Sequence, residues 1–166
     1  MRVLDLGIGT GNLAARFLHA GCRVWGIDFS MHMLAQTRAQ LPQVNLIQAD
    51  LLAAWPLSWR QPFARVVSAY VFHEFDLAIK LSLLQRIARH YLAPRGQVLI
   101  ADIAFPTADA RAAAARRWAA DWDEDEHYWA ADEVIAASAQ IGLQVTYRQV
   151  SSCGGVFVFT VKETGV

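Results

Sequence analysis

The stretch Val3-Leu4-Asp5-Leu6-Gly7-Ile8-Gly9-Thr10-Gly11-Asn12 decides the fold of this chain. Residues 2–6 have the length and apolar composition of a buried parallel strand, and a segment with helical spacing of apolar residues begins at Asn12. The three alternate glycines between them suit a backbone that takes positive φ and lets a ligand lie against the main chain. A helix start also presents free N–H groups. The stretch therefore predicts a strand–loop–helix unit that binds a ligand, in preference to a ligand-free turn.

The same alternation of strand and helix continues along the chain. Strands are expected at 2–6, 23–28, 44–48, 65–72, 97–103, 143–150 and 156–162, and helices at 12–20, 31–41, 77–91, 108–120 and 132–141. Prolines predict a loop over 55–62 and a turn at 94–96. Only residues 151–155 join the last two strands, which is too short for a parallel crossover. We predict a single α/β domain over 1–166, doubly wound, whose mostly parallel sheet has about seven strands and one antiparallel C-terminal strand.

The composition excludes several classes of protein. Of the 166 residues, 55% are hydrophobic and 18% charged, which is too apolar for a disordered chain. The 15 basic and 15 acidic residues give zero net charge, which argues against a nucleic-acid partner. No apolar run approaches the roughly 18 residues of a membrane helix, and the first residues do not form a signal peptide. Cys22 and Cys153 make neither a disulfide framework nor a metal-ligand pattern, so we expect reduced, partly buried thiols in a cytoplasmic protein.

Acidic residues stand at the ends of the first three expected strands. Asp5 precedes the first glycine by two residues, Asp28 ends the second strand, and Asp50 follows the third. The carboxyl ends of strands are where α/β sheets bind ligands, and Asp28 can accept both hydroxyls of a ribose there. Asp50 or its main chain can meet an adenine amine. Because Asp5 would repel a pyrophosphate and attract an ammonium group, a nucleoside with an amino-acid tail fits these acids better than NAD does.

These residues resemble the motifs of class I S-adenosylmethionine-dependent methyltransferases. Residues 5–11 are similar to the glycine loop of that family, 49–51 to its adenine-side motif and 68–73 to the end of its fourth strand. Residues 92–97 are similar to its turn before the fifth strand, although Arg95 stands where the family usually has glycine. The resemblance covers nearly all of the chain and is greatest to small-molecule methyltransferases, including uncharacterised bacterial ones. It implies a Rossmann-like fold and methyl transfer from S-adenosylmethionine to a small-molecule acceptor.

The resemblance also implies a cofactor site. Asp5, partly through water, and the glycine loop would hold the methionine part, with Ala69 and Tyr70 lining its end. Asp28 would bind the ribose, and Phe29 would pack against the adenine, with core packing of Phe29 as the alternative. The residues assigned to the cofactor are Asp5, Gly7, Ile8, Gly9, Gly11, Asn12, Asp28, Phe29, Asp50, Leu51, Ala69 and Tyr70.

His73 and Glu74, which follow the fourth strand, are the candidates for acid–base chemistry. Methyl transfer from a sulfonium depends mainly on alignment and exclusion of water, and it needs a base only where the acceptor must lose a proton. We predict His73 as that catalytic base; the alternative is that it orders the loop or caps the next helix. The Asn/Asp-Pro-Pro-Tyr/Phe signature of nucleobase amine methylation is absent at 68–71, which argues further against nucleic acid.

Residues 118–129 combine clustered acids with Trp118, Trp122, Tyr128 and Trp129. The segment is either a wall or lid of the acceptor site, or a solvated acidic turn whose aromatic side chains pack on the domain, and the second interpretation is favoured. Its acids and His127 do not define a metal geometry, so no metal is predicted. The arginines at 111, 116 and 117 are expected to face this acidic run rather than an anionic substrate.

The chain begins directly at a strand, whereas members of the resembled family usually carry helices before it that cover the cofactor. We therefore expect a domain without that cover, weak cofactor binding and turnover, and a bare patch that favours a homodimer. Two other functions stay open beside the methyltransferase. One is a non-catalytic module that binds S-adenosylmethionine, and the other is an NAD-dependent oxidoreductase, against which the glycine spacing and the reversed last strand argue.

Overall fold

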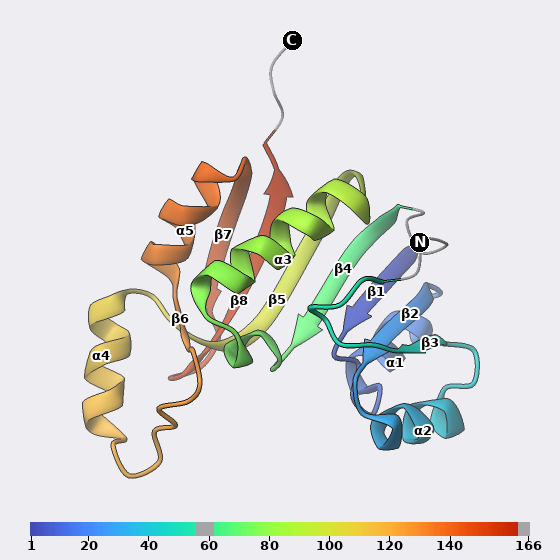
Figure 1. Cartoon of the computed structure of the whole chain (residues 1–166), viewed down its shortest axis with the longest axis horizontal. Helices are drawn as coiled ribbons and strands as arrows, with labels where there is room; N and C mark the ends of the chain where they lie inside the picture. The colour runs from blue at the N-terminus through green and yellow to red at the C-terminus, as the bar shows by residue number, and fades with distance from the viewer. Residues whose placement is uncertain (56–61, 163–166) are drawn as a thin grey trace.

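The computed structural model describes residues 1–55 and 62–162, and the elements alternate as expected (Figure 1). In chain order they are β1 (Arg2–Leu6), α1 (Asn12–His19), β2 (Arg23–Asp28), α2 (Met31–Gln40), β3 (Asn45–Gln48), β4 (Phe63–Ala69), the 3-10 helix η2 (Phe72–Glu74), α3 (Leu77–His90), β5 (Leu92–Phe105), α4 (Ala108–Arg117), β6 (Trp129–Ala130), α5 (Ala131–Gln140), β7 (Leu143–Gln149) and β8 (Gly154–Val161). The predicted loop over 55–62 falls mostly outside the described residues.

The described strands form one sheet in the order β3-β2-β1-β4-β5-β8-β7, with the short β6 beside the end of β5. The pairs from β3 through β5 are parallel, and β8 runs antiparallel to both β5 and β7. The doubly wound, mostly parallel sheet with one reversed C-terminal strand is therefore confirmed. The carboxyl ends of the parallel strands meet at one edge of the sheet, which is where such folds place ligands.

Two apolar cores cover the two faces of the sheet. The larger core packs Leu84 and Ile87 of α3 and Val134 of α5 onto the central strands, and the smaller one packs Ala14 of α1 and Leu34 of α2. Two of the helices that meet these cores, α2 and α3, begin at side-chain caps. The Ser30 hydroxyl accepts from the backbone N–H of Met33, and the Asp76 carboxylate accepts from that of Ile79.

The structure corrects several of the predicted bounds of strands and helices. The strand expected over 65–72 covers Phe63–Ala69 instead, because Tyr70 takes a positive φ of 57° and residues 72–74 turn into η2. The expected turn at 94–96 lies inside β5, which begins at Leu92, with Arg95 at a φ of 60°. Strand β6, at residues 129–130, was not predicted. The helix expected over 108–120 ends at Arg117.

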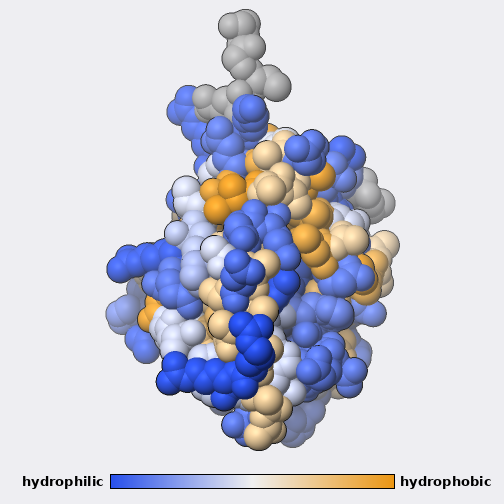
Figure 2. All heavy atoms as spheres, turned by 90° about the vertical axis from the view of Figure 1, so that its left-hand side faces the viewer, coloured by the Kyte–Doolittle hydropathy of each residue, from blue (hydrophilic) through white to orange (hydrophobic). Residues whose placement is uncertain are grey.

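The outer surface suits a domain in water on the face that carries α4, α5 and β7. Figure 2 shows that face, where hydrophilic side chains are interrupted by smaller apolar patches. The edge strand β7 exposes Gln144 and Arg148, and polar or charged side chains on an edge discourage pairing with another chain. Cys22 is half-buried and Cys153 is exposed, both as free thiols, so only Cys22 matches the expected partial burial. None of the helices in the described ranges could span a membrane.

We predict that Trp129 is essential for stability, because it is 1% exposed and packs between Phe72 and Phe157. Trp129→Ala is expected to lower the free energy of unfolding by roughly 3–5 kcal/mol, as for other large buried aromatics. Trp118→Ala removes a half-buried tryptophan and is the control. Urea unfolding of both variants tests this, and an equal loss in the two would contradict it.

Candidate active site

The glycine loop between β1 and α1 is shaped by its own backbone. Gly7, Gly9 and Gly11 all take positive φ, at 69°, 54° and 85°, a region that other residues rarely adopt. The N–H of Gly7 donates to the carbonyl of Ile27 at 2.8 Å, which anchors the loop to β2. At Gly7 a side chain would also collide with Val71, whereas Gly9 has open space above it. The loop is therefore a tight turn that requires glycine and leaves room for a ligand at Gly9.

Asp28 connects the glycine loop to the end of β2. One oxygen of its carboxylate accepts from the N–H of Gly9 at 2.8 Å and the other accepts from the N–H of Ser30 at 2.8 Å. The Thr37 hydroxyl donates to the carbonyl of Gly9 at 2.6 Å and fixes the loop from α2. Each carboxylate oxygen keeps a further lone pair, so Asp28 can still accept from the hydroxyl groups of a ligand.

Asp5, the other acid of this region, lies inside the protein. Its side chain is 2% exposed, and Oδ2 has no hydrogen-bond partner within the described part of the chain. Burial, with a smaller contribution from the charge of Asp28, raises the pKa of Asp5 to about 8. A buried acceptor without a donor is costly, and a positively charged donor would relieve that cost.

A cleft of about 390 Å³ opens at the ends of β1, β2 and β4. Six residues predicted for the cofactor line it, and they are Gly7, Asp28, Phe29, Asp50, Leu51 and Tyr70. Phe29 is 78% exposed, so the alternative that it packs in the core is wrong. Tyr70 is also largely exposed, and its positive φ turns the chain sharply at the cleft. With Phe75 and Glu74, which also line it, the cleft offers three aromatic rings beside three carboxylates.

The other six predicted residues lie around this cleft without lining it. Asp5 and Ile8 are buried, Gly9 and Gly11 belong to the loop, Asn12 is the exposed first residue of α1, and Ala69 ends β4. Val71 and Phe75 line the cleft and were not predicted. Their apolar side chains resemble core residues in sequence, so no local pattern distinguishes them.

Arg86 of α3 holds the loop after β3 in place. Its guanidinium donates to the carbonyls of Leu51 and Ala53, the second at 2.9 Å, and lies 4.5 Å from the ring centroid of Trp55. Burial lowers the pKa of Arg86. The loop that carries Leu51 is thereby fixed against the larger core, which keeps one wall of the cleft rigid.

His73 of η2 is bound to Asp102 of β5 twice. Its ring Nδ1 lies 2.6 Å from Asp102 Oδ1, and its backbone N–H donates to Asp102 Oδ2 at 2.9 Å. Since a carboxylate only accepts, Nδ1 carries the proton and Nε2 is left as the free ring atom. The hydrogen bond from the His73 ring to Asp102 is the largest cause that raises the pKa of His73, whereas burial acts to lower this pKa. His73 orders this loop, while Asp76 caps α3, so the alternative of His73 as a helix cap is wrong.

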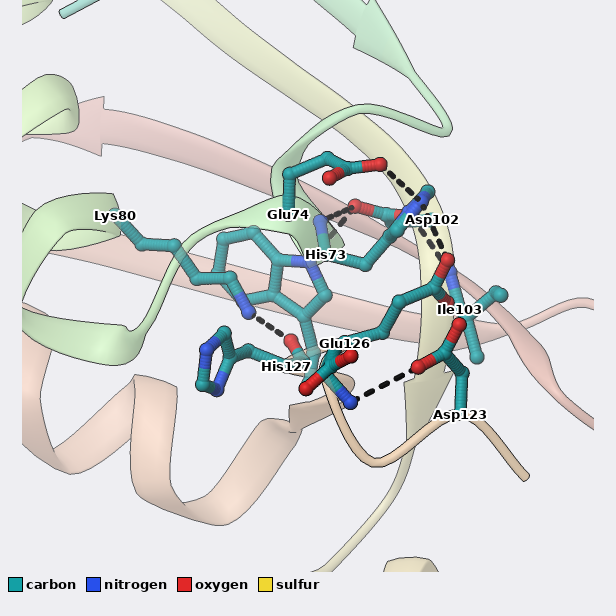
Figure 3. Close-up of polar contacts among 10 residues, drawn as sticks. His73, Glu74, Lys80, Asp102, Ile103, Asp123, Glu126 and His127 are labelled. Atoms are coloured by element: carbon teal, nitrogen blue, oxygen red, sulfur yellow. Dashed lines mark hydrogen bonds and ion pairs between the residues drawn. The ribbon is translucent and has the colours of Figure 1, made fainter.

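Two further carboxylates face the free nitrogen of His73 (Figure 3). Nε2 lies 3.7 Å from Oε1 of Glu74 and 3.6 Å from Oε1 of Glu126. One atom from each of the three residues lies within 4.8 Å of the others. Glu126 comes from the acidic segment 118–129, far along the sequence, so the fold brings that segment to His73. Asp102 was not predicted, although a single acid in the apolar run Val98-Leu99-Ile100-Ala101-Asp102-Ile103 is a signal for a buried, partnered carboxylate.

A second cleft, of about 360 Å³, lies between α3, α5 and the segment 118–129. Trp122, Tyr128 and Glu126 line it together with two cations, Lys80 and Arg111. The Lys80 ammonium donates to the carbonyl of His127 and lies 4.3 Å from the ring centroid of Trp129, and burial lowers its pKa to about 8. Both cations of this cleft are therefore already engaged, since Arg111 pairs with Glu133 at 3.0 Å.

The segment 118–129 follows both earlier interpretations in part. Trp122 packs against Phe105 with tilted rings and edge-to-face against Tyr128, and most of the acids are exposed, as in a solvated turn packed on the domain. Glu126 differs, because it is turned inward to His73. Arg111 does contact this segment, because it donates to the carbonyl of Tyr128 at 3.0 Å, but its charged partner is Glu133 of α5 and not an acid of the run.

Comparisons with known proteins now place the chain. A family model described as "Methyltransferase domain" matches residues 3–96. An uncharacterized methyltransferase of Geobacillus thermodenitrificans is 31% identical over 154 residues, which cover 89% of this chain and 71% of that protein. The uncharacterized methyltransferase OB1106 of Oceanobacillus iheyensis is 32% identical over 110 residues, and the match spans 66% of this chain and only 50% of that relative.

The fold agrees with that assignment. The structure of a DhpI–SAH complex superposes with a TM-score of 0.74 at 18% identity, over 98% of this chain and 77% of that one. The chain belongs to the class I S-adenosylmethionine-dependent methyltransferases, with their Rossmann-like fold.

We predict that Asp5 lowers stability at neutral pH. Its folded pKa of about 8 exceeds the ordinary value of 3.8, so between these values the folded state holds a proton that the unfolded state has lost. Stability then falls as the pH rises through this window. Asp5→Asn is expected to gain on the order of 1–3 kcal/mol at pH 7.5 and to flatten the dependence.

Urea unfolding at pH 5 and pH 7.5 measures this difference. Asp50→Asn, an exposed acid at the same edge, is the control and should behave like the parent chain. A parent chain that grows more stable from pH 5 to pH 7.5, with Asp5→Asn following it, would show that Asp5 is ionised in the folded state.

Proposed function

We propose that the chain binds S-adenosylmethionine in the 390 Å³ cleft and its adjoining glycine loop, and transfers the methyl group to a small-molecule acceptor. The buried, unpartnered Oδ2 of Asp5 carries the proposal. This oxygen is a buried hydrogen-bond acceptor beside the glycine loop, and the lack of a donor costs folding free energy. The protonated amino group of a methionine tail would donate a hydrogen bond to it. A nicotinamide dinucleotide brings a pyrophosphate to the same loop, which Asp5 and Asp28 disfavour.

The cofactor roles follow the position of each residue in the cleft. Asp28 is oriented by two N–H donors and would accept from the ribose hydroxyls. Phe29 and Leu51 would enclose the adenine, with Asp50 at its edge, and Tyr70 would cover the methionine end. The backbone of Gly7, Ile8, Gly9 and Gly11, with Asn12 and Ala69 flanking it, would shape the bed for the ligand.

When bound, S-adenosylmethionine supplies a methyl group on a sulfonium that is already a good leaving group. His73 stands at the same edge of the sheet, and its neighbour Glu74 lines the cofactor cleft. The imidazole Nε2 would take the proton of the acceptor, and Asp102 would hold the ring in the tautomer that leaves Nε2 free. This oriented base favours an enzyme over the alternative of a non-catalytic binding module.

The second cleft supports the proposal that the methyl acceptor is a small molecule. The 360 Å³ cleft beside Glu126 has the size of a site for a compact metabolite, and its cations are engaged by protein groups. We propose one methyltransferase domain for the chain, and self-association into a homodimer stays a prediction.

Calorimetric titration with S-adenosylhomocysteine, beside NAD, tests the cofactor. Binding of S-adenosylhomocysteine in the micromolar range and no binding of NAD are expected, because only the first brings a protonated amine, which is a cationic N–H donor, to Asp5. Asp5→Asn should weaken binding about tenfold, in line with a lost charge-assisted contact. Binding of NAD with S-adenosylhomocysteine inert would refute the proposal.

We predict that His73 and Asp102 act as a unit in turnover. His73→Ala is expected to slow formation of S-adenosylhomocysteine by about 10²–10⁴-fold with any acceptor that must lose a proton. Asp102→Asn should lower the pKa of His73, because the hydrogen bond that raises it is weakened. The acid limb of the pH–rate profile then moves to lower pH while the maximum rate falls.

NMR titration of the His73 ring reads that pKa independently of turnover. Glu124→Gln, at an exposed position, is the matched control. An unchanged rate for His73→Ala would remove His73 from the mechanism.

A further inference from the structure

The side chains around His73 Nε2 are all hydrogen-bond acceptors. With the ring proton on Nδ1, Nε2 presents a lone pair to Glu74 and Glu126, at distances of 3.7 and 3.6 Å that are too long for direct hydrogen bonds. His73 is itself nine-tenths buried, with its side chain 10% exposed. Ionised carboxylates carry no donor either. Three acceptors thus converge on one point with no donor among them.

The charge around this point is negative. Asp102 is satisfied by four N–H donors, and the nearby Lys80 is bound to the carbonyl of His127. Arg111 is paired with Glu133. In the described structure Glu126 accepts a hydrogen bond from the Tyr128 hydroxyl, but neither Glu74 nor Glu126 pairs with a lysine or arginine, so the point would repel an anionic acceptor and attract a cationic one.

We infer that the acceptor is an amine, which binds as its ammonium ion between His73, Glu74 and Glu126. The inference rests on the proposed methyltransferase function and names its substrate class. A primary ammonium group has three N–H donors, which matches the three acceptors, whereas an alcohol has one. Glu74 lines the cofactor cleft and Glu126 the second cleft, so the nitrogen would sit between the methyl donor and the aromatic pocket.

An ammonium ion fits the site better than a metal ion does. Metal ligands are usually fixed by a second layer of hydrogen bonds, and here Asp102 fixes His73 and Tyr128 holds Glu126, but Glu74 has no such partner among the described residues. The side chain of Glu74 is 65% exposed, and no hydrogen bond in the described structure restrains it. A flexible carboxylate can still pair with an ammonium group, which is less demanding in geometry.

The chemistry balances with these residues alone and the methyl donor. The ammonium group gives one proton to Nε2 of His73 and becomes a neutral amine with a free electron pair. That pair forms the new nitrogen–carbon bond while the carbon–sulfur bond breaks and its electrons stay on sulfur. The products are a methylated ammonium ion and S-adenosylhomocysteine, and His73 then returns its proton to solvent. Trp122 and Tyr128 would hold the apolar remainder of the amine in the second cleft.

Three compounds with the same phenyl frame test the inference in the full chain. They are 2-phenylethylamine, 2-phenylethanol and 3-phenylpropanoate, titrated calorimetrically with saturating S-adenosylhomocysteine and again without it. The amine is expected to bind about tenfold more tightly than the alcohol, and the carboxylate most weakly. Formation of S-adenosylhomocysteine from S-adenosylmethionine should be fastest with the amine.

Variants locate the binding point. Glu126→Gln and Glu74→Gln should each weaken amine binding about fivefold to tenfold, with affinity for the alcohol unchanged. Glu126 does not line the cofactor cleft, so Glu126→Gln should also leave the affinity for S-adenosylhomocysteine unchanged. Glu124→Gln makes the same change at an exposed position of the same segment and should have no effect. Thermal unfolding of each variant confirms that the fold is intact.

Three results would overturn the inference. They are equal or stronger binding of the alcohol or carboxylate, amine binding that ignores both glutamates, and tight Mn²⁺ binding that Glu126→Gln abolishes and that blocks the amine. Failure of the proposed function reads differently, as a lack of S-adenosylhomocysteine binding, and the titrations without it still decide the amine question.

Discussion

The carboxylate of Asp102 forms the hydrogen bonds on which the proposed catalytic part of this domain depends. It is buried and accepts from the ring and backbone of His73, from the backbone of Ile103 and from the indole of Trp129. A buried charge is tolerable only with such a set of donors. The same atoms therefore join β5, η2 and β6. The position of the proposed base and the path of the segment that carries Glu126 are set by one side chain.

The proposed cofactor site is organised by a second pair of acids, Asp28 and Asp5. In contrast to Asp102, Asp5 lacks a donor for one of its oxygens, Oδ2, in the described structure. Asp28 accepts from one N–H donor on each oxygen, while Asp5 is buried beside it. Burial without a compensating donor is consistent with the raised pKa of Asp5. Tyr70 adds a strained backbone conformation at the same edge. Both features cost folding free energy, and both lie at one end of a well-packed sheet. Such a concentration of unfavourable features is typical of a ligand-binding site.

The sequence predicts the parts of this protein that depend on local pattern. The strand and helix order, the caps at Ser30 and Asp76 and the reversed last strand all follow from spacing, turn residues and connection length. Six of the twelve proposed cofactor residues line one cleft, because each follows a strand that ends at the same edge. Residue spacing does not predict hydrogen bonds between side chains that are distant in the sequence. Nothing within ten residues of Asp102 indicates that His73 is its partner, 29 positions earlier.

The same limit explains the acidic segment. A run of charges usually indicates a solvated turn, and most of residues 121–126 are exposed. Trp129 changes the outcome for one of them, because its buried indole is bound to Asp102 and draws the end of the segment onto the domain. Glu126, three residues earlier, is thereby brought to His73, on the side away from the cofactor cleft. Glu74 approaches the same nitrogen from the cleft itself. One imidazole thus meets a carboxylate from each cleft, and under the proposed function the acceptor would be selected at this point rather than in either cleft alone.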